Sequence, residues 1–288
     1  MNRNFQNWAR ALRAYSFTAT VIPVLCAFLS ARAQGLPVAW TLLPLMLFCA
    51  LLLHAGVNLL NDYYDFVLGF DTAEARGSSG LLTEGIVRPE YMRRRGRFYI
   101  FAGASAGLLL AAARGWPLLL MGIAGLAGAW FYSHRKGYKY KGLGEPFVFV
   151  LMGLLLFGGA FYTATGTITL GAVWPALACG CLVTAILLVN NLRDIQMDGQ
   201  AGFTTLPIRI GATRTKNLYA ALVVTALIAT CAAGIFLPLL SLPLAWRRIH
   251  SVQTATEPSH DLADAPQQTA AFYLIFGVLL AAGLILSF

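Results

Sequence analysis

Long apolar runs separated by short polar connections dominate the pattern of this chain. Eight runs approach the length of a membrane-spanning helix, which needs about 20 residues: residues 15–31, 40–57, 98–113, 117–132, 147–163, 170–189, 218–237 and 270–288. Backbone groups exposed to lipid must satisfy their hydrogen bonds within their own segment, so these runs are predicted to be helices. A ninth, shorter run covers residues 238–246. The pattern predicts an all-α membrane protein with about nine crossings.

The composition supports this prediction and excludes an ordinary soluble domain. Of the 288 residues, 58% are hydrophobic and only 11% are charged, and the mean hydropathy is +0.67. A soluble domain carries about 25% charged residues, which form its polar surface. No linker separates two soluble parts, so residues 1–288 are expected to form one integral-membrane domain. The five cysteines lie inside apolar runs and lack metal-ligand spacing, so we expect them to be packing residues.

The net charge of +9 is concentrated in alternate connections. Cations precede the first run and follow the second, fourth, sixth and short runs: Arg3, Arg10 and Arg13; Arg76, Arg88, Arg93, Arg94, Arg95 and Arg97; Arg135, Lys136, Lys139 and Lys141; Arg193, Arg209, Arg214 and Lys216; Arg247 and Arg248. Cations favour the cytoplasmic side of short loops. This predicts a cytoplasmic N-terminus and cytoplasmic basic loops, in a bacterial inner membrane. Membrane lipid is then the expected surrounding, and neither a nucleic acid nor an obligatory protein partner is needed.

Glycines recur at helical spacing in two of the runs. Gly103 and Gly107 form a small-xxx-small pair, and Gly122, Gly125 and Gly128 lie about one turn apart. In lipid, small residues let helices approach closely. We expect all five glycines to serve helix packing.

Two runs end in ordered sets of aspartate and asparagine. The sets follow the second and sixth runs: Asn58, Asn61, Asp62 and Asp65; Asn190, Asp194 and Asp198. On helices, the spacings i, i+3, i+4, i+7 and i, i+4, i+8 place each set on one face. A helix end at the membrane interface can carry one such polar residue simply because it contacts water. This contact does not explain two ordered sets, because carboxylates near lipid are costly and usually functional.

These side chains are hard oxygen ligands without His or Cys at ligand spacing, which favours Mg²⁺. Mg²⁺ usually binds through one or two carboxylates and substrate phosphate oxygens. Two opposed sets therefore predict two Mg²⁺ ions with a diphosphate between them. Four cations are expected on the same side of the membrane: Arg76, Lys139, Arg193 and Arg209. A diphosphate at a membrane cavity implies a lipid tail, so a polyprenyl diphosphate is the predicted substrate.

At these residues the chain resembles the UbiA superfamily of membrane prenyltransferases, and within it the MenA-type 1,4-dihydroxy-2-naphthoate polyprenyltransferases. NLLNDYYDFVLGFDT (residues 58–72) is similar to the first family motif, with Asn61 and Asp65 as its NxxxD core. NNLRDIQMDGQAG (190–202) is similar to the second, with Asp194 and Asp198 as its DxxxD pair. YKGLGEPFVFVLMG (140–153) is similar to the segment that opens the fifth span.

The resemblance implies nine helices around a central cavity and an Mg²⁺-dependent prenyltransferase of menaquinone biosynthesis. Polyprenyl diphosphate is the implied donor and an aromatic compound the acceptor, 1,4-dihydroxy-2-naphthoate in this branch. The implied metal ligands are Asn61, Asp65, Asp194 and Asp198, with Asp62 nearby. Asp65, Asp194, Asp198 and Lys139 are the predicted catalytic residues, with Lys139 on the diphosphate. Asn58, Asp71, Arg76, Tyr132 and Asn190 are implied to shape the pocket, and the cation Arg193 completes the predicted substrate-binding set.

Two departures from the branch leave the acceptor open to 4-hydroxybenzoate or another naphthoate. Residues 133–135 are Ser-His-Arg where the branch has Thr-Gly-Gly, and Phe203 and Thr204 stand where it has basic residues. RGSSG (76–80) replaces the sequence typical of the 4-hydroxybenzoate and haem O branches, which disfavours them. A cation-coupled transporter is a further alternative. It predicts acidic residues near the bilayer midplane, whereas here they cluster at one interface.

Overall fold

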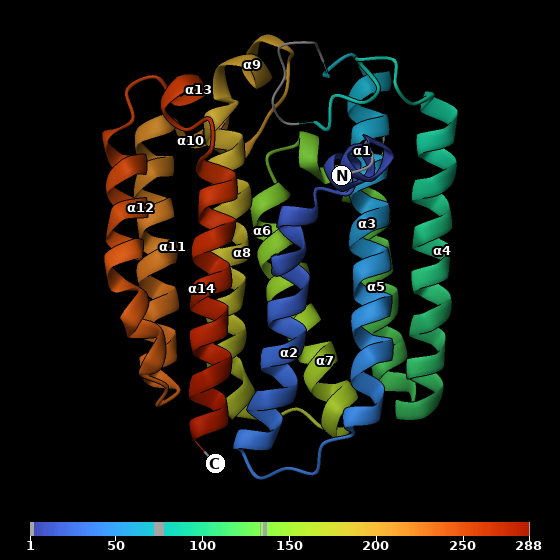
Figure 1. Cartoon of the computed structure of the whole chain (residues 1–288), viewed down its shortest axis with the longest axis vertical. Coiled ribbons are helices and arrows are strands. Elements are labelled where there is room, and N and C mark those ends of the chain that lie inside the picture. The colour runs from blue at the N-terminus through green and yellow to red at the C-terminus, as the bar shows by residue number, and fades with distance from the viewer. Residues whose placement is uncertain (1–2, 72–77, 133, 135–136, 288) are drawn as a thin grey trace.

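The computed structural model describes residues 3–71, 78–132, 134 and 137–287. Upright helices form one bundle (Figure 1). Apart from one isolated parallel bridge between Lys141 and Thr204, the regular structure of these residues is helical. The all-α prediction is therefore confirmed.

Seven helical segments of the described residues are long and apolar enough to cross a membrane. They are Ala14–Ala33 (η1 and α2), Trp40–Val67 (η2 and α3), Pro89–Arg114 (α4), Gly144–Thr165 (α6, η4 and α7), Leu170–Arg193 (η5 and α8), Ala212–Ala232 (α11) and Ala265–Leu286 (α14). The composite segments contain α2 (Thr18–Ala33), α3 (Leu43–Val67), α6 (Gly144–Val148), the π-helix η4 (Phe149–Leu155), α7 (Leu156–Thr165) and α8 (Val173–Arg193).

Two further segments stand in the same bundle without meeting the criteria for a span. The apolar α5 (Trp116–Tyr132) has only 17 residues. The run at 238–246 extends beyond its predicted end, because η6 (Leu237–Ser241) continues as α12 (Leu242–Thr254), which includes Arg247 and Arg248. By length and composition, seven crossings are therefore supported in the described part of the chain, and the predicted nine are not confirmed.

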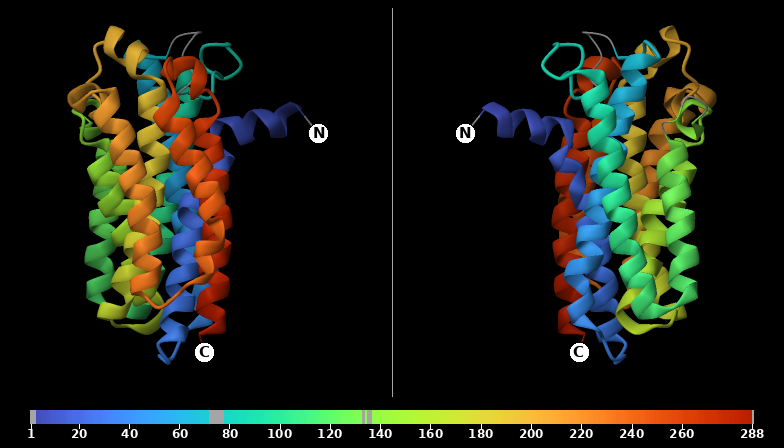
Figure 2. Two further views of the ribbon diagram at one scale, coloured as in Figure 1. Left: turned by 90° about the vertical axis from the view of Figure 1, so that its left-hand side faces the viewer. Right: turned by 90° about the vertical axis from the view of Figure 1, so that its right-hand side faces the viewer.

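The longer polar connections lie at one end of the bundle, which we call the site end. It holds α9 (Ile195–Gln200), α10 (Leu206–Ile210) and α13 (Pro258–Asp261), while the C-terminus lies at the opposite end (Figure 1). The N-terminal α1 (Arg3–Ala11) projects sideways near the site end (Figure 2). The polar segments that were separate in sequence therefore surround one end of the bundle.

Close packing explains some of the predicted glycines and not others. A Cβ at Gly103 would come within 2.9 Å of the Leu53 side chain, and one at Gly128 would overlap Leu151. A Cβ at Gly122 would meet no heavy atom within 4 Å. The packing prediction is therefore confirmed at Gly103 and Gly128 and wrong at Gly122, where the helix borders open space.

Candidate active site

The acidic end of α3 is held by a cation from the loop between α5 and α6. Asn61 and Asp65 lie one turn apart on α3, and Asn61 Nδ2 donates to Asp65 Oδ2 at 2.9 Å. Lys139, in the short helix η3 (Tyr138–Tyr140), donates from Nζ to Asn61 Oδ1 at 2.7 Å and to Asp65 Oδ2 at 2.7 Å. Tyr140 OH donates to the other oxygen, Asp65 Oδ1, at 2.9 Å. This arrangement brings together three of the predicted site residues, Asn61, Asp65 and Lys139.

Tyr140 remains a hydrogen-bond donor because of its surroundings. Burial, followed by the charge of the adjacent Asp65 carboxylate, raises the pKa of Tyr140 above its ordinary range. The phenol therefore keeps its proton. Asp65 thus receives hydrogen bonds from a cation, a neutral amide and a neutral hydroxyl.

Asp62 faces a different partner, in the N-terminal segment. Arg13 Nη2 lies 2.6 Å from Asp62 Oδ1, and the backbone N–H of Ser79 donates to Asp62 Oδ2 at 3.2 Å. Asp62 is fully buried. Arg13 itself has φ +50°, the one positive φ of a non-glycine residue in the described part of the chain. Such a conformation is uncommon outside glycine, and here it lies at the turn between α1 and the first span, where the guanidinium reaches Asp62.

The second acidic set lies at the junction of α8 and α9. Arg193 donates from Nε to Asp194 Oδ1 at 2.7 Å and from Nη2 to Asp194 Oδ2 at 2.6 Å, which is a two-point ion pair. It also donates to Asn190 Oδ1 at 3.1 Å. The expected single helix through Asp194 and Asp198 is wrong, because Asp194 forms a turn between the two helices. The N–H of Asp198 still donates to the Asp194 carbonyl at 2.9 Å, so the one-turn spacing is kept.

The two acidic sets influence each other electrostatically. Burial raises the pKa of Asp198 to about 7, and the Asp194 and Asp65 carboxylates add to this shift, while the Lys139 ammonium opposes it. Burial also raises the pKa of Asp71 to about 6, opposed by a hydrogen bond from Ser78 and reinforced by Asp62 and Asp65. Carboxylates that shift one another in this way lie close together in a poorly solvated region.

An aromatic cluster made of Phe70, Tyr140 and Phe203 joins the loops beside these carboxylates. The rings of Phe70 and Phe203 have centroids 3.7 Å apart, and Tyr140 stacks on Phe203 at 5.2 Å. The backbone bridge between Lys141 and Thr204 lies next to the stacked pair. Phe203 is 8% exposed. The loop after α9 is thereby packed onto the segment that carries Lys139.

The residues fit a magnesium site by donor chemistry, although they do not form one by themselves. Among the residues that the structure describes, no three His, Cys, Asp or Glu side chains are grouped to hold a metal ion. Asp65 and Asp194 face cations instead. The carboxylate and amide oxygens are nevertheless ligands that Mg²⁺ prefers. Within the described residues, the buried Oδ1 of Asp71 accepts no hydrogen bond. These protein oxygens suit an Mg²⁺ ion whose remaining ligands are phosphate oxygens of a bound substrate.

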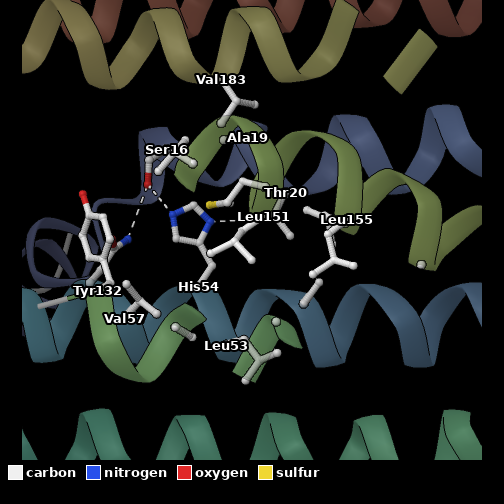
Figure 3. Close-up of a pocket in the computed structure, with 18 of the residues that line it drawn as sticks. Ser16, Ala19, Thr20, Leu53, His54, Val57, Tyr132, Leu151, Leu155 and Val183 are labelled. Atoms are coloured by element: carbon white, nitrogen blue, oxygen red, sulfur yellow. Dashed lines mark hydrogen bonds between the residues drawn. The ribbon is translucent and has the colours of Figure 1, made fainter. Parts of the chain in front are cut away.

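An elongated cavity of about 300 Å³ extends from this site into the bundle. Asn58, Asn61, Tyr132 and Asn190 line its polar end together with Arg13. Deeper in the bundle, the lining is almost entirely apolar. Figure 3 shows part of this wall, with Leu151, Leu155 and Val183 around His54. The polar end of the cavity can therefore bind a charged head group, and its walls can enclose a hydrophobic tail.

His54 connects the wall of the cavity to the N-terminal segment. Its ring nitrogens lie 2.6 Å from Thr20 Oγ1 and 3.1 Å from Ser16 Oγ (Figure 3). Ser16 Oγ donates to the Arg13 carbonyl at 2.8 Å, and Asn58 Nδ2 donates to the Leu12 carbonyl at 2.8 Å. Because both nitrogens are hydrogen-bonded to hydroxyls, His54 holds the segment that carries Arg13 in place.

Comparison with known proteins gives the family. A sequence profile of the UbiA prenyltransferase family matches residues 20–274. The chain belongs to the UbiA prenyltransferase family. The 1,4-dihydroxy-2-naphthoate octaprenyltransferase of Mycobacterium leprae is 32% identical over 294 residues, covering 99% of this chain and 98% of that protein. This UbiA-family chain is therefore a prenyltransferase and an integral membrane protein, as the sequence predicted.

Solved structures of UbiA homologs share the fold. The apo homolog from Aeropyrum pernix K1 aligns with a TM-score of 0.70 at 18% identity, covering 93% of this chain and 97% of that one. The homolog from Archaeoglobus fulgidus bound to DMAPP and Mg²⁺ aligns with a TM-score of 0.65 at 13% identity, covering 96% and 99%. At these identities the likeness shows the UbiA fold.

Several residues of this UbiA-family site were not predicted from the sequence to belong to it. Arg13, Tyr140 and Phe203 each make a contact with the predicted set or with the loop beside it. In the sequence, Arg13 differs from other residues only as one of the basic residues before the first span. Those residues are equally well explained by the cytoplasmic side of the membrane. Of the predicted residues, Arg76 lies outside the described part of the chain.

Proposed function

We propose that the chain transfers a polyprenyl group from its diphosphate to an aromatic acceptor with the help of Mg²⁺, and that the acceptor is 1,4-dihydroxy-2-naphthoate. The observation that carries this proposal is that the two acidic sets act on each other electrostatically near Lys139, and that Asn61 and Asn190 from these sets line the polar end of the apolar cavity. The name of the M. leprae relative, which matches over nearly its whole length, supports the acceptor. The A. fulgidus homolog bound to DMAPP and Mg²⁺ supports the donor and the metal.

In this proposal, Asn61, Asp65, Asp194 and Asp198 would hold two magnesium ions, with Asp62 nearby in its ion pair with Arg13. Bound Mg²⁺ supplies positive charge that stabilises a diphosphate leaving group. Lys139 and Arg193, which pair with Asp65 and Asp194 in this structure, are the cations that would face the diphosphate oxygens if the carboxylates held metal ions. Asn58, Asp71, Arg76, Tyr132 and Asn190 shape the pocket around the reacting carbon.

The bond between the prenyl carbon and the diphosphate oxygen breaks, and its electron pair stays on the oxygen. Lys139 stabilises the charge that develops there, in a site where few water molecules weaken the interaction. The electron-rich acceptor ring attacks the resulting allylic cation, and the ring then loses its carboxylate as CO₂, whose bonding electrons return to the ring and restore its aromaticity. The apolar walls below Tyr132 exclude water, which would otherwise convert the cation to an alcohol.

The site end faces the cytoplasm of a bacterial inner membrane in this proposal. The acidic sets share that end with the basic connections, which favour the cytoplasmic side. Single cysteines at Ser259 and Ser287, in a variant without the native cysteines, test the orientation. An impermeant maleimide added to intact cells is expected to label Ser287→Cys and to spare Ser259→Cys, and the reverse result would contradict the proposed orientation.

A membrane assay tests the reaction. Membranes that contain the protein receive geranylgeranyl diphosphate and either 1,4-dihydroxy-2-naphthoate or 4-hydroxybenzoate, with and without Mg²⁺. We expect Mg²⁺-dependent prenylation of the naphthoate, lost in Asp65→Ala and Asp194→Ala. Glu257→Ala, which removes an exposed carboxylate near α13, is the matched control and is expected to retain activity. Full transfer by the two aspartate variants would refute the proposed site, and preference for 4-hydroxybenzoate would refute the acceptor.

A further inference from the structure

The face of α5 that borders the cavity has glycines in its middle. Six α5 residues line the cavity, at positions i, i+3, i+4, i+7, i+11 and i+14: Leu118, Met121, Gly122, Gly125, Ala129 and Tyr132. This spacing places them on one face of the helix. A Cβ at Gly122 would meet nothing within 4 Å, and one at Gly125 would only reach Leu155 Cδ2 at 3.8 Å. Both positions therefore open into the cavity.

The two glycines lie at successive depths. Tyr132 lines the polar end, and Gly125 and Gly122 precede it by seven and ten residues on the same helix. At roughly 1.5 Å per residue, they lie roughly 10 and 15 Å below it, and Leu118 lies roughly 21 Å below it. An extended isoprene unit adds four carbon–carbon bonds to the main chain, or roughly 5 Å. The third unit of a prenyl tail would thus lie beside Gly125 and the fourth beside Gly122.

We propose that Gly125 and Gly122 make room for the third and fourth isoprene units and so determine how much of the prenyl chain the protein recognises. This inference rests on the proposed prenyl diphosphate donor. Chains longer than about four units extend beyond the roughly 21 Å of α5 that lines the cavity. Their further units lie outside the cavity and add no affinity.

A leucine at either glycine would fill the space of about one isoprene unit, since their carbon numbers are nearly equal. A unit that loses its buried position loses the free energy of burying several methylene groups, which corresponds to roughly tenfold or more in affinity. Gly158 on α7 provides a matched control. A Cβ there also meets nothing within 4 Å, but Gly158 does not line the cavity.

The test is direct binding of tritiated dimethylallyl, geranyl, farnesyl, geranylgeranyl and octaprenyl diphosphates to purified protein with Mg²⁺. The affinity of the wild type is expected to rise up to geranylgeranyl diphosphate and then level off. In Gly122→Leu the highest affinity should move to the farnesyl compound, and in Gly125→Leu to the geranyl compound. In each variant, the donor that is one unit longer should bind roughly tenfold more weakly than it binds to the wild type. Gly158→Leu should keep the wild-type profile.

An unchanged length profile in both cavity variants, or equal shortening in Gly158→Leu, would overturn the inference. Gly122→Ala and Gly125→Ala add little volume and are expected to give smaller shifts in the same order, so the test does not depend on one tolerated substitution. The measurement reports donor binding alone. A failure of the proposed function, in which donors bind but no acceptor is prenylated, is therefore distinguishable from a failure of this inference.

Discussion

Lys139 Nζ lies 2.7 Å from Asp65 Oδ2, although 74 residues separate them in the chain. The pair is largely buried, with side chains 15% and 11% exposed. It joins the loop between α5 and α6 to the end of α3. Because the same ammonium also contacts Asn61, the cation sits among the oxygens that we propose as metal ligands.

Replacing Lys139 with alanine is expected to lower the rate of prenyl transfer by roughly 10²–10³-fold, because one preorganised charge on the leaving group is lost. Lys139→Arg should recover only part of the rate, since a planar guanidinium does not reproduce the contacts of a compact ammonium. Initial rates at saturating donor and Mg²⁺ measure the effect. Lys141→Ala removes an exposed cation from the same loop and is the control. An unimpaired Lys139→Ala protein would exclude this role.

The ion pair between Arg13 and Asp62 is expected to matter for stability. Arg13→Met leaves a fully buried carboxylate without its cation, which costs about 3–5 kcal/mol of unfolding free energy. The double variant Arg13→Met/Asp62→Asn should regain much of this loss, because no buried charge remains unpaired. Thermal unfolding in detergent provides the measurement.

A surface ion pair in the same segment serves as the comparison. Arg10 pairs with Glu84, and both side chains are 45% exposed. Arg10→Met is therefore expected to destabilise the protein much less than Arg13→Met. Equal destabilisation by Arg10→Met and Arg13→Met, or no recovery in the double variant, would show that burial of Asp62 does not govern the effect.

The aromatic cluster of Phe70, Tyr140 and Phe203 is expected to keep water from the reacting carbon. Phe203→Ala removes the ring that contacts both of the others, so water gains access next to Asp65. The ratio of prenyl alcohol to prenylated product should rise several-fold at constant donor. Phe98→Ala, at a ring that is 58% exposed on α4, should leave the ratio unchanged. The same ratio in Phe203→Ala and wild type would contradict this role.

Proton binding at Asp198 is expected to compete with Mg²⁺. Burial, with the nearby Asp194 carboxylate, raises the pKa of Asp198 to about 7. Below that pH the metal-free carboxyl holds a proton that it must lose to bind a cation. The apparent Mg²⁺ affinity should therefore increase as the pH rises from about 6 to about 8, and then level off. The Mg²⁺ concentration for half-maximal transfer at each pH measures this.

Asp198→Asn removes the titrating group at nearly constant size. This variant should bind Mg²⁺ more weakly, with a flatter dependence on pH in the same range. Asp71, whose pKa is raised to about 6, contributes at the acid end. A wild-type Mg²⁺ affinity that does not change between about pH 6 and 8 would contradict the competition.

The sequence pattern was sufficient to predict the helices and to place the residues of each acidic set relative to one another. In lipid, each apolar run must satisfy its own backbone hydrogen bonds, so α3, α8 and α14 follow from the sequence pattern. The helical period then places Asn61 and Asp65 on one face, whatever surrounds them. The break at Asp194 was not predicted, and the pattern left open how far the helix at 238–246 extends, because helix ends depend on contacts with neighbouring segments.

The partners of the predicted residues were decided by tertiary structure alone. The contacts of Asp62 with Arg13 and of Tyr140 with Phe203 join residues about 50 and 60 positions apart, and no local period relates such positions. Tertiary structure also decided which residues border the cavity. Gly122 and Gly128 belong to the same glycine series in the sequence, yet Gly122 faces the cavity and Gly128 packs on Leu151. Residue type and spacing determined which helices form and which faces are polar, whereas the position of each helix against the next determined which cation meets which carboxylate and where a prenyl chain has room.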